Sequence, residues 1–307
     1  MENTGVLRVG IVGAGGIAPP HIEGWLTLGA DVSILRRTDA DLLAAQHGLR
    51  IVDGLDALID RVDVVDIISP TPTHPDVARA AFTSGRHVVC EKPLATTASD
   101  AREMIDAARA AGVRLFPAHV VRYFEGYRML HERIPEVGTL TELTFRRTVA
   151  APDAAWFYAE DAGGGLIRDL MIHDLDQALW LAGSVVEVSA TQDPPAVGGQ
   201  VTPPVSAHVT LTHANGAMSH LRADWLEPGT PFRSQVEVAG AGADGILRFD
   251  TDAEPEDDAP YRAQLADFVE AIRTGRDARV TPEDGLAAVA LVDAAYASLA
   301  ARRPVTF

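Results

Sequence analysis

The hydrophobic pattern of the first 120 residues alternates short apolar runs with longer stretches that are rich in Ala and Leu. Short apolar runs separated by helices are typical of βαβ units on a parallel sheet. We therefore predict a parallel sheet with helical crossovers in this part of the chain. The predicted strands are LRVGIVG, DVSILR, VDVVDIIS, RHVVCE and VRLFPA, and the predicted helices lie at 17–28, 39–47, 75–84 and 99–111.

The pattern changes after about residue 120. Several runs that suit strands follow one another with short turns between them, such as HANG at 213–216, and this indicates an antiparallel sheet. We predict an α/β domain over residues 1–120 and an α+β domain over residues 121–307. In the second domain the predicted helices lie at 123–133, 166–182, 261–274 and 281–301, and the predicted strands lie near 185–192, 205–213, 216–224, 234–240 and 245–249.

The segment GGGLIRDLMIHDLDQALWLAG, residues 163–183, is apolar around most of a helix. Asp169, His173 and Asp176 nevertheless follow one another at i, i+4 and i+7, so a regular helix would place them on one face. Trp180 closes this narrow polar stripe at the next helical step. A polar stripe between apolar flanks suggests a cleft, whereas an ordinary solvated face is the alternative.

Composition and charge limit the partners. Of the 307 residues, 47% are hydrophobic and 22% are charged, which is ordinary for a soluble chain of two domains. The net charge of −17 repels nucleic acid and anionic membranes, so we expect neither as a partner. Cys90 is the single cysteine, which excludes an internal disulfide and a cysteine-based zinc site. The N-terminus lacks a signal-peptide pattern and no apolar run approaches about 20 residues, so we expect a cytoplasmic protein.

The run RVGIVGAGGIA, residues 8–18, carries an apolar strand directly into a glycine-rich turn. Gly13, Gly15 and Ala18 fit the pattern G-x-G-x-x-[G/A], with Gly16 and Ile17 between the last two. In this pattern the first glycine makes the tight turn, the second admits a pyrophosphate, and the helix N-terminus presents N–H groups to the phosphates. The place at the start of a βαβ unit favours a dinucleotide site over a plain tight turn.

A lysine follows the predicted strand in the segment HVVCEKPLATTA, residues 87–98. Ligands of parallel sheets bind beyond the carboxyl ends of the strands, so Lys92 stands where chemistry is expected. Pro93 ends the strand and stiffens the turn. The alternative is a solvated surface lysine.

Together these segments resemble the Gfo/Idh/MocA family of nicotinamide-dependent oxidoreductases, which is named for glucose–fructose oxidoreductase and inositol dehydrogenase. Besides the glycine turn, the resemblance rests on Glu91-Lys92-Pro93, on SPTPTH at 69–74, on the Gly163-Gly164-Gly165 triplet leading to Asp169-x-x-x-His173, and on residues 267–305, so it covers nearly the whole chain. It implies a Rossmann domain followed by a domain with a large, mostly antiparallel sheet. The open face of that sheet commonly forms the oligomer contact in the family.

The resemblance also implies a reaction and its residues. The reaction is hydride transfer between NAD(P) and a secondary alcohol or ketone of a sugar, polyol or cyclitol. Lys92, Asp169 and His173 would be catalytic and would contact the substrate. His173 is the best candidate for proton transfer because histidine titrates near neutral pH, and Lys92 would hold the reacting oxygen; which of the two is the formal base stays open. The residues expected at the cofactor are Gly13, Gly15, Gly16, Ile17, Arg36, Arg37, Ser69, Pro70, Thr71, His74, Glu91 and Lys92.

Three further residues have two interpretations each. Asp176 either holds the imidazole of His173 or caps a surface contact. Arg122 follows the expected domain crossover at HVVRYF, and it either reaches the substrate or lies on a surface helix. Trp156 either lines the substrate pocket or belongs to the core.

Rival functions use the same residues. A metal hydrolase would take Asp169 and His173 at i, i+4 as ligands, but the segment around Lys92 argues against it, and we expect no metal. A catalytically silent NAD(P)-binding regulatory protein of the same fold would bind the dinucleotide without turnover. A reductase of a keto-sugar or an imine would remain an enzyme with a different reaction. A substrate-dependent change in the absorbance of the nicotinamide separates an enzyme from the regulator.

The choice of cofactor depends on ILRRTD, residues 34–39. In NAD-type folds an acidic residue ends the second strand and binds the adenosine ribose. Arg36 and Arg37 occupy that turn in this chain, and guanidinium groups can grip the extra phosphate of NADP. Thr38 can add a donor, whereas Asp39 would restore a preference for NAD if the strand were longer. We expect NADP, with NAD as the alternative.

The strands VSAHVTLTH and AMSHLRADW carry apolar residues on both faces in places. A sheet with helices on one side must cover its other face in some way. We therefore expect a homodimer or a homotetramer.

Overall fold

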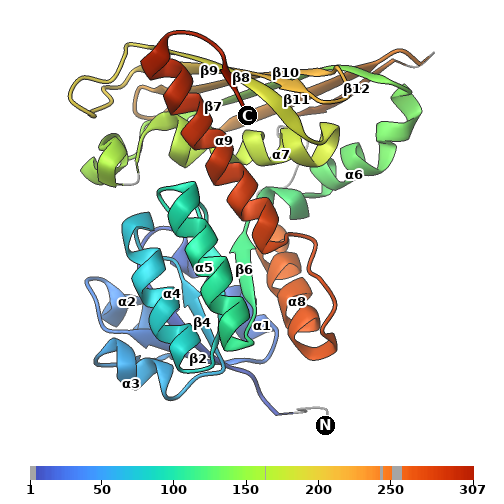
Figure 1. Cartoon of the computed structure of the whole chain (residues 1–307). Helices are drawn as coiled ribbons and strands as arrows, with labels where there is room; N and C mark the ends of the chain where they lie inside the picture. The colour runs from blue at the N-terminus through green and yellow to red at the C-terminus, as the bar shows by residue number, and fades with distance from the viewer. Residues whose placement is uncertain (1–4, 163, 243–244, 251–257) are drawn as a thin grey trace. The chain divides into compact units, whose positions relative to one another are not determined.

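The structure is a computed structural model that describes residues 5–162, 164–242, 245–250 and 258–307. The chain forms two compact units (Figure 1). The first comprises Met1–Tyr123 and Asp257–Leu286, and the second comprises Phe124–Glu256 and Ala287–Phe307. The single division expected near residue 120 is therefore incomplete, because residues 257–286 return to the first unit.

The first unit contains a sheet of six strands in the order β3-β2-β1-β4-β5-β6, and every neighbouring pair is parallel. This confirms the predicted Rossmann sheet. The strands are β1 Arg8–Val12, β2 Asp31–Leu35, β3 Arg50–Val52, β4 Val64–Ile67, β5 His87–Glu91 and β6 Leu115–Ala118. The helices are α1 Ala18–Thr27, α2 Ala40–His47, α3 Leu55–Ile59, α4 His74–Thr83, α5 Ala98–Ala111 and α8 Ala259–Thr274.

The central strands of this sheet are buried along their length, which explains why they read as continuous apolar runs. All four residues of β4 are buried, and so are the last four of β1 and of β5. The strand order reverses between β1 and β4, and the crevice beyond the carboxyl ends of such strands is where ligands bind. The prediction missed β3, which has three residues and only one buried position.

The returning helix α8 packs on α1 and on the turn that follows β6. Gly24 of α1 allows the close approach, because a Cβ at this position would lie 2.7 Å from Cδ1 of Leu265. The ring of Phe268 stacks on Phe116 of β6 with 4.9 Å between the centroids. These contacts make α8 part of the core of the first unit, although more than a hundred residues separate it from β6.

The second unit contains a sheet of seven strands in the order β12-β11-β7-β10-β9-β8-β13. Among the strands that the structure describes, β7 and β10 alone pair in parallel, so the expected mostly antiparallel sheet is confirmed. Figure 1 shows α6 and α7 on one face of it. The elements are α6 Glu125–Arg133, β7 Leu140–Ala150, α7 Ile172–Ala182, β8 Val185–Asp193, β9 Val205–His213, β10 Met218–Leu226, β11 Arg233–Gly240, β12 Ile246–Asp250, α9 Pro282–Ala301, which begins in the first unit, and β13 Val305–Thr306.

The sequence pattern missed β7, although this strand lies in the interior of the sheet, between β11 and β10. Its inward positions are Leu143, Phe145 and Arg147, all of them buried. A charged residue at a core-facing position breaks the apolar alternation by which a strand is recognised.

The helical segment around residue 170 is not a regular α-helix. Ile167–Met171 forms a π-helical turn, and α7 follows from Ile172. Because a π-turn has more residues per turn, the spacing of Asp169 and His173 no longer specifies a single α-helical face. Gly163, the first glycine of the triplet, lies outside the described residues.

By length and composition alone, α9 could cross a membrane, contrary to the expectation that no apolar run approaches that length. This is weak evidence, because core helices of soluble proteins pass the same test. In its apolar window, 39% of the residues are buried within the protein, among them Ala288, Val289, Leu291 and Val292.

Candidate functional site

The glycine turn lies between β1 and α1 and is shaped by two different constraints. Gly13 has a φ of 129°, and a Cβ there would lie 2.6 Å from the backbone of Ile68, so only glycine fits. Gly15 and Gly16 are exposed, and an added Cβ at either would have no described atom within 4 Å. Open space therefore lies beside the start of α1 at Ala18, where a phosphate group can approach the backbone N–H groups.

The turn after β2 places Arg36 directly beyond the strand. Its Nε donates to Asp53 at 2.5 Å and its Nη1 donates to Asp41 at 2.7 Å. These interactions raise the pKa of Arg36, the hydrogen bond to Asp53 most of all. Because β2 ends at Leu35, Asp39 does not take the position at the strand end that the alternative interpretation requires.

The turn after β4 is tied to the turn after β5 by a histidine. The ring of His74 has Nε2 at 2.7 Å from the carbonyl oxygen of Ser69 and Nδ1 at 3.0 Å from that of Pro93. Burial lowers the pKa of His74. Of the expected cofactor contacts in this turn, His74 and Thr71 are buried, whereas Ser69 and Pro70 are at least partly accessible.

Lys92 follows the last residue of β5 and is half-buried. It is the only lysine in a chain that contains 26 basic residues, all the others being arginine. A solvated cation at the surface is served equally well by arginine, so a lone lysine at this strand end indicates chemistry that a guanidinium cannot perform, such as proton exchange. This signal was available in the sequence and was overlooked.

Glu91 was expected at the cofactor, but it is buried in the first unit. Its Oε1 lies 3.1 Å from Nε2 of His21, and its Oε2 accepts the backbone N–H of Lys92 at 3.0 Å. Glu91 therefore holds the backbone of Lys92, and its expected contact with the cofactor stays a prediction.

In the second unit, Asp169 lies on the π-helical turn and His173 lies in the first turn of α7, and both are half-buried. The backbone N–H of Asp169 donates to the carbonyl of Gly165 at 2.9 Å. Asp176 is completely buried, so its interpretation as a cap on a surface contact is wrong. The amide of Gln177 donates to Asp176 at 3.3 Å.

Sequence reasoning missed a buried ion pair beside His173. Nε and Nη2 of Arg147 donate to the carboxylate of Asp174 at 2.7–3.2 Å, and Nη2 also donates to Oη of Tyr127 at 3.1 Å. Tyr127 in turn lies 2.7 Å from the hydroxyl of Ser234. This network fixes α7, which carries His173, to β7, α6 and β11. The charged residue at a core-facing position of β7 was the signal that could have revealed it.

Arg122 does not lie on a surface helix and Trp156 does not belong to the core, so neither has the purely structural role that was its alternative. Arg122 is 2% exposed, and its Nη2 donates to Asp284 at 3.2 Å, so it does not lie on a surface helix. Burial alone raises the pKa of Asp284, but Arg122 and Thr281 outweigh it and lower the pKa. Trp156 is partly exposed, stacks on Phe157 at 3.8 Å, and does not belong to the buried core.

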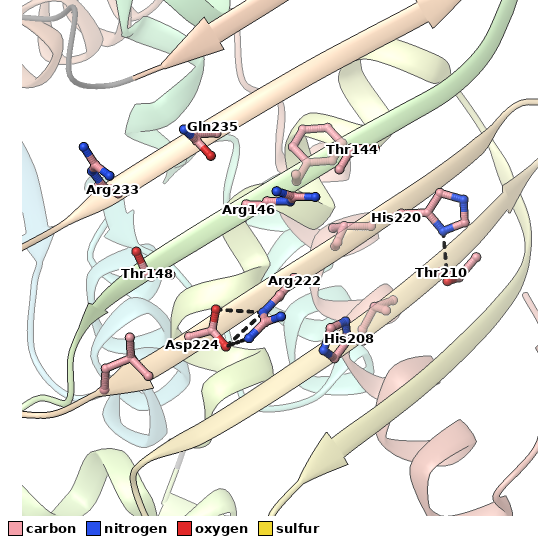
Figure 2. A pocket seen from close by; sticks show the side chains of 14 residues that line it. Thr144, Arg146, Thr148, His208, Thr210, His220, Arg222, Asp224, Arg233 and Gln235 are labelled. Atoms are coloured by element: carbon pink, nitrogen blue, oxygen red, sulfur yellow. Dashed lines mark hydrogen bonds and ion pairs between the residues drawn. The ribbon is translucent and has the colours of Figure 1, made fainter. Parts of the chain in front are cut away.

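A groove of about 690 Å³ lies on the outward face of the second sheet (Figure 2). It is lined mainly by polar side chains of β7, β9, β10 and β11, among them the ion pair of Arg222 with Asp224 at 3.0 Å. The expected apolar residues on both faces are found on β10, where Met218 and Leu226 lie on the outward face while Leu221 and Ala223 are buried, but they are not found on β9. The strand alternates strictly, with Val205, Ala207, Val209 and Leu211 buried and with Ser206, His208, Thr210 and Thr212 turned outward.

Comparison with known proteins covers the chain almost from end to end. Three family models match it: "Oxidoreductase family, NAD-binding Rossmann fold" over residues 7–119, "GFO/IDH/MocA C-terminal domain" over residues 127–244, and "Oxidoreductase family, C-terminal alpha/beta domain" over residues 251–307. The resemblance seen in the sequence is thereby confirmed.

Individual relatives have related activities. The chain is 30% identical over 310 residues to dTDP-3,4-didehydro-2,6-dideoxy-alpha-D-glucose 3-reductase of Streptomyces antibioticus, a match that covers 88% of this chain and 89% of that protein. It is 29% identical over 331 residues to inositol 2-dehydrogenase of Paracoccus denitrificans, covering 95% and 94%. The solved structure of GenD2 from gentamicin A biosynthesis, in complex with NAD, is 26% identical, with a TM-score of 0.87 and coverage of 98% and 96%.

Proposed function

Because this chain belongs to the Gfo/Idh/MocA family of nicotinamide-dependent oxidoreductases, we propose that it transfers a hydride between NAD(P) and a secondary alcohol or ketone of a sugar, polyol or cyclitol. The names of its relatives, a reductase of a dTDP-sugar and an inositol dehydrogenase, support this substrate class. The single observation that carries the proposal is that the only lysine of the chain directly follows strand β5 of the Rossmann sheet, at its carboxyl end.

The first unit fits a dinucleotide. Gly15 and Gly16 leave open space at the start of α1, and Gly13 makes the turn that exposes the N–H groups there. We assign the pyrophosphate to this turn and the adenosine ribose to the turn after β2. When bound, the nicotinamide supplies the hydride acceptor or donor.

Lys92, Asp169 and His173 supply the remaining chemistry. Oxidation of an alcohol needs a base for the hydroxyl proton and a donor that holds the oxygen as negative charge develops on it. One of Lys92 and His173 takes the hydroxyl proton, and the other donates a hydrogen bond to the reacting oxygen. Asp169 orients the substrate or favours the imidazolium that forms when His173 takes the proton. In the direction of reduction the same groups return the proton.

The test is a panel of sugars, polyols and inositols offered with NAD⁺ and with NADP⁺, followed by the absorbance of the reduced nicotinamide. Lys92→Ala and His173→Ala each lose at least ~10²-fold in turnover while still binding the dinucleotide, because a positioned proton-transferring or oxyanion-stabilising group is typically worth this much. Lys92→Arg keeps the charge and serves as the matched variant, and His47→Ala on α2 is the control histidine.

The outcomes separate the alternatives. Loss of turnover in Lys92→Arg assigns a role that charge alone does not fill, and near-normal turnover in Lys92→Ala removes the lysine from the mechanism. Dinucleotide binding without turnover on any substrate of the panel identifies the protein as a regulatory relative instead of an enzyme.

We further propose that the cofactor is NADP. Arg36 and Arg37 are both exposed in the turn after β2. Asp41 and Asp53 compete for Arg36, but both are more than 70% exposed, and ion pairs between exposed side chains are weak. A phosphate group carries a larger charge than a carboxylate and can accept two parallel hydrogen bonds from a guanidinium, which favours its pairing with Arg36.

We also propose a homodimer or homotetramer that forms through the outward face of the second sheet. The support is its mixture of Arg146, Arg222 and Arg233 with Asp224, Glu142 and Glu237, whose opposite charges allow two copies of the same face to pair. Light scattering at micromolar protein concentration tests this, and a monomeric mass rejects it.

A further inference from the structure

A buried chain of charged groups links the helix of the glycine turn to Lys92. His21 lies in the first turn of α1 and is completely buried, as is Asp66 of β4. Nδ1 of His21 lies 2.8 Å from Oδ2 of Asp66, and Nε2 lies 3.1 Å from Oε1 of Glu91. The second oxygen of Glu91 accepts the backbone N–H of Lys92 at 3.0 Å. All these residues belong to the first unit.

The ring of His21 carries a positive charge in this setting. Both of its nitrogens face carboxylate oxygens, and only the doubly protonated ring donates to both. Burial by itself lowers the pKa of His21, but the charges and hydrogen bonds of Asp66 and Glu91 raise it to about 10. Burial likewise raises the pKa of Glu91, and the hydrogen bond and charge of His21 outweigh it and lower the pKa.

The other groups around the ring do not replace this charge. The indole of Trp25 donates to the same oxygen of Asp66 at 2.7 Å. The ring of Tyr261 of α8 lies 5.8 Å from that of His21, and burial and the charge of Glu91 raise its pKa. Burial, Glu91 and Asp66 raise the pKa of the Cys90 thiol. No group of His, Cys, Asp and Glu suited to a metal ion occurs among the residues that the structure describes.

Such an arrangement is costly, which argues that it does more than fill space. A buried cation requires paired carboxylates to offset its desolvation, and the first turn of a helix is an unfavourable place for positive charge. Apolar residues of similar volume would pack α1 on β4 and β5 at lower cost. What they would not provide is a fixed acceptor for the N–H of Lys92.

We propose that His21 is a buried imidazolium that acts as a positioning residue: it fixes Glu91, and Glu91 fixes the peptide of Lys92, so that the dinucleotide-binding helix sets the position of the lysine. The inference rests on the proposed role of Lys92. His21 itself touches neither substrate nor cofactor in this account, and its effect reaches the reaction through two hydrogen bonds.

The lone lysine makes a test possible that needs no substrate. Reductive methylation with ¹³C-formaldehyde labels Lys92 and the N-terminal amine, and the Lys92→Arg variant identifies which NMR signal belongs to the lysine. In His21→Gln we expect the Lys92 signal to move and its response to added NADP⁺ or NAD⁺ to weaken. Trp25→Phe, which deletes another donor to Asp66 and leaves the link to Glu91 intact, keeps the wild-type signal.

Glu91→Gln provides a second variant of nearly unchanged shape. Its amide oxygen can accept from Lys92 only if its NH₂ group faces Nε2 of His21, which must then lose its proton. ¹⁵N NMR of the histidine ring at a pH near 8 therefore shows His21 protonated on both nitrogens in the wild type and on Nδ1 alone in Glu91→Gln. A neutral His21 in the wild type at this pH overturns the proposal.

Kinetics complete the test once a substrate is found. His21→Gln lowers kcat by ~10-fold or more with little change in KM for the dinucleotide, because a small misplacement of a reacting group is costly to turnover. Wild-type kcat and an unmoved Lys92 signal in His21→Gln overturn the positioning role even where Lys92 proves essential. The expected NMR changes without turnover on any substrate support the positioning role and reject only the proposed function.

Discussion

Replacing Arg147 by methionine tests the buried network that holds α7. The guanidinium donates to Asp174 at 2.7–3.2 Å, and the two side chains are only 4% and 1% exposed. Methionine occupies a similar volume but leaves the Asp174 carboxylate buried without its cation. Breaking a buried pair in this way costs about 3–5 kcal/mol, a large fraction of the ~5–15 kcal/mol that a typical domain has.

Two further variants show whether the loss of stability comes from the unpaired buried carboxylate. Arg147→Met combined with Asp174→Leu removes both charges, and Tyr127 keeps its 2.7 Å contact with Ser234, so we expect a loss of less than ~2 kcal/mol. Arg248→Met on β12 breaks an ion pair of the same 2.7 Å length with Glu237, but these two side chains are 70% and 42% exposed, so the loss is at most ~1 kcal/mol.

Urea unfolding followed by tryptophan fluorescence measures these losses. In a Trp25→Phe background the remaining tryptophans, Trp156, Trp180 and Trp225, all belong to the second unit and report its unfolding. The midpoint shifts at constant slope give the free energies. A loss below ~1 kcal/mol for Arg147→Met, equal to that of the exposed pair, refutes the reasoning.

Three other predictions concern the first unit. Gly13→Ala destabilises the fold, because its Cβ would lie 2.6 Å from the backbone of Ile68. The Cβ of Gly15→Ala meets nothing within 4 Å, so this variant keeps the wild-type melting temperature and weakens only dinucleotide binding. Equal melting temperatures of the two variants contradict this prediction. Arg36→Asp loses a charge-assisted hydrogen bond to the phosphate, so it lowers the affinity for NADP by ~10-fold or more and leaves the affinity for NAD unchanged or improved. Titration calorimetry measures both affinities, with Arg79→Asp as the exposed control. Equal losses for both cofactors reject the assignment. The pKa of His21 is raised to about 10 from its ordinary 6.5, so the stability that its charge gives the fold is complete below pH 6.5 and is lost as the pH rises towards 10. The difference in urea midpoint between the wild type and His21→Gln should therefore narrow from pH 6.5 to pH 10. A difference that does not change with pH shows that His21 is not charged.

Much of the first unit follows from local sequence. Strands buried on both faces are uninterrupted apolar runs, so β1, β2, β4, β5 and β6 are recognisable from the residues alone. The glycine turn and Lys92 are defined by their place directly after such strands. The family resemblance then supplies the order of the domains and the class of reaction. Each of these inferences needs only a few neighbouring residues, because strand burial and turn geometry act over that range.

The tertiary structure decided what depends on partners far apart in the chain. His21 is separated from Asp66 by 45 residues and from Glu91 by 70, and no spacing in the sequence shows that these three charges meet in one buried cluster. The interior strand β7 was not predicted because Arg147 places a charge at a core-facing position, which is acceptable only beside Asp174, 27 residues further along. The return of α8 to the first unit depends on the close contact of Gly24 with Leu265. A buried charge is tolerated only where its counter-charge lies, and which distant residues come together is fixed by the packing of the whole fold and not by the local sequence around either partner.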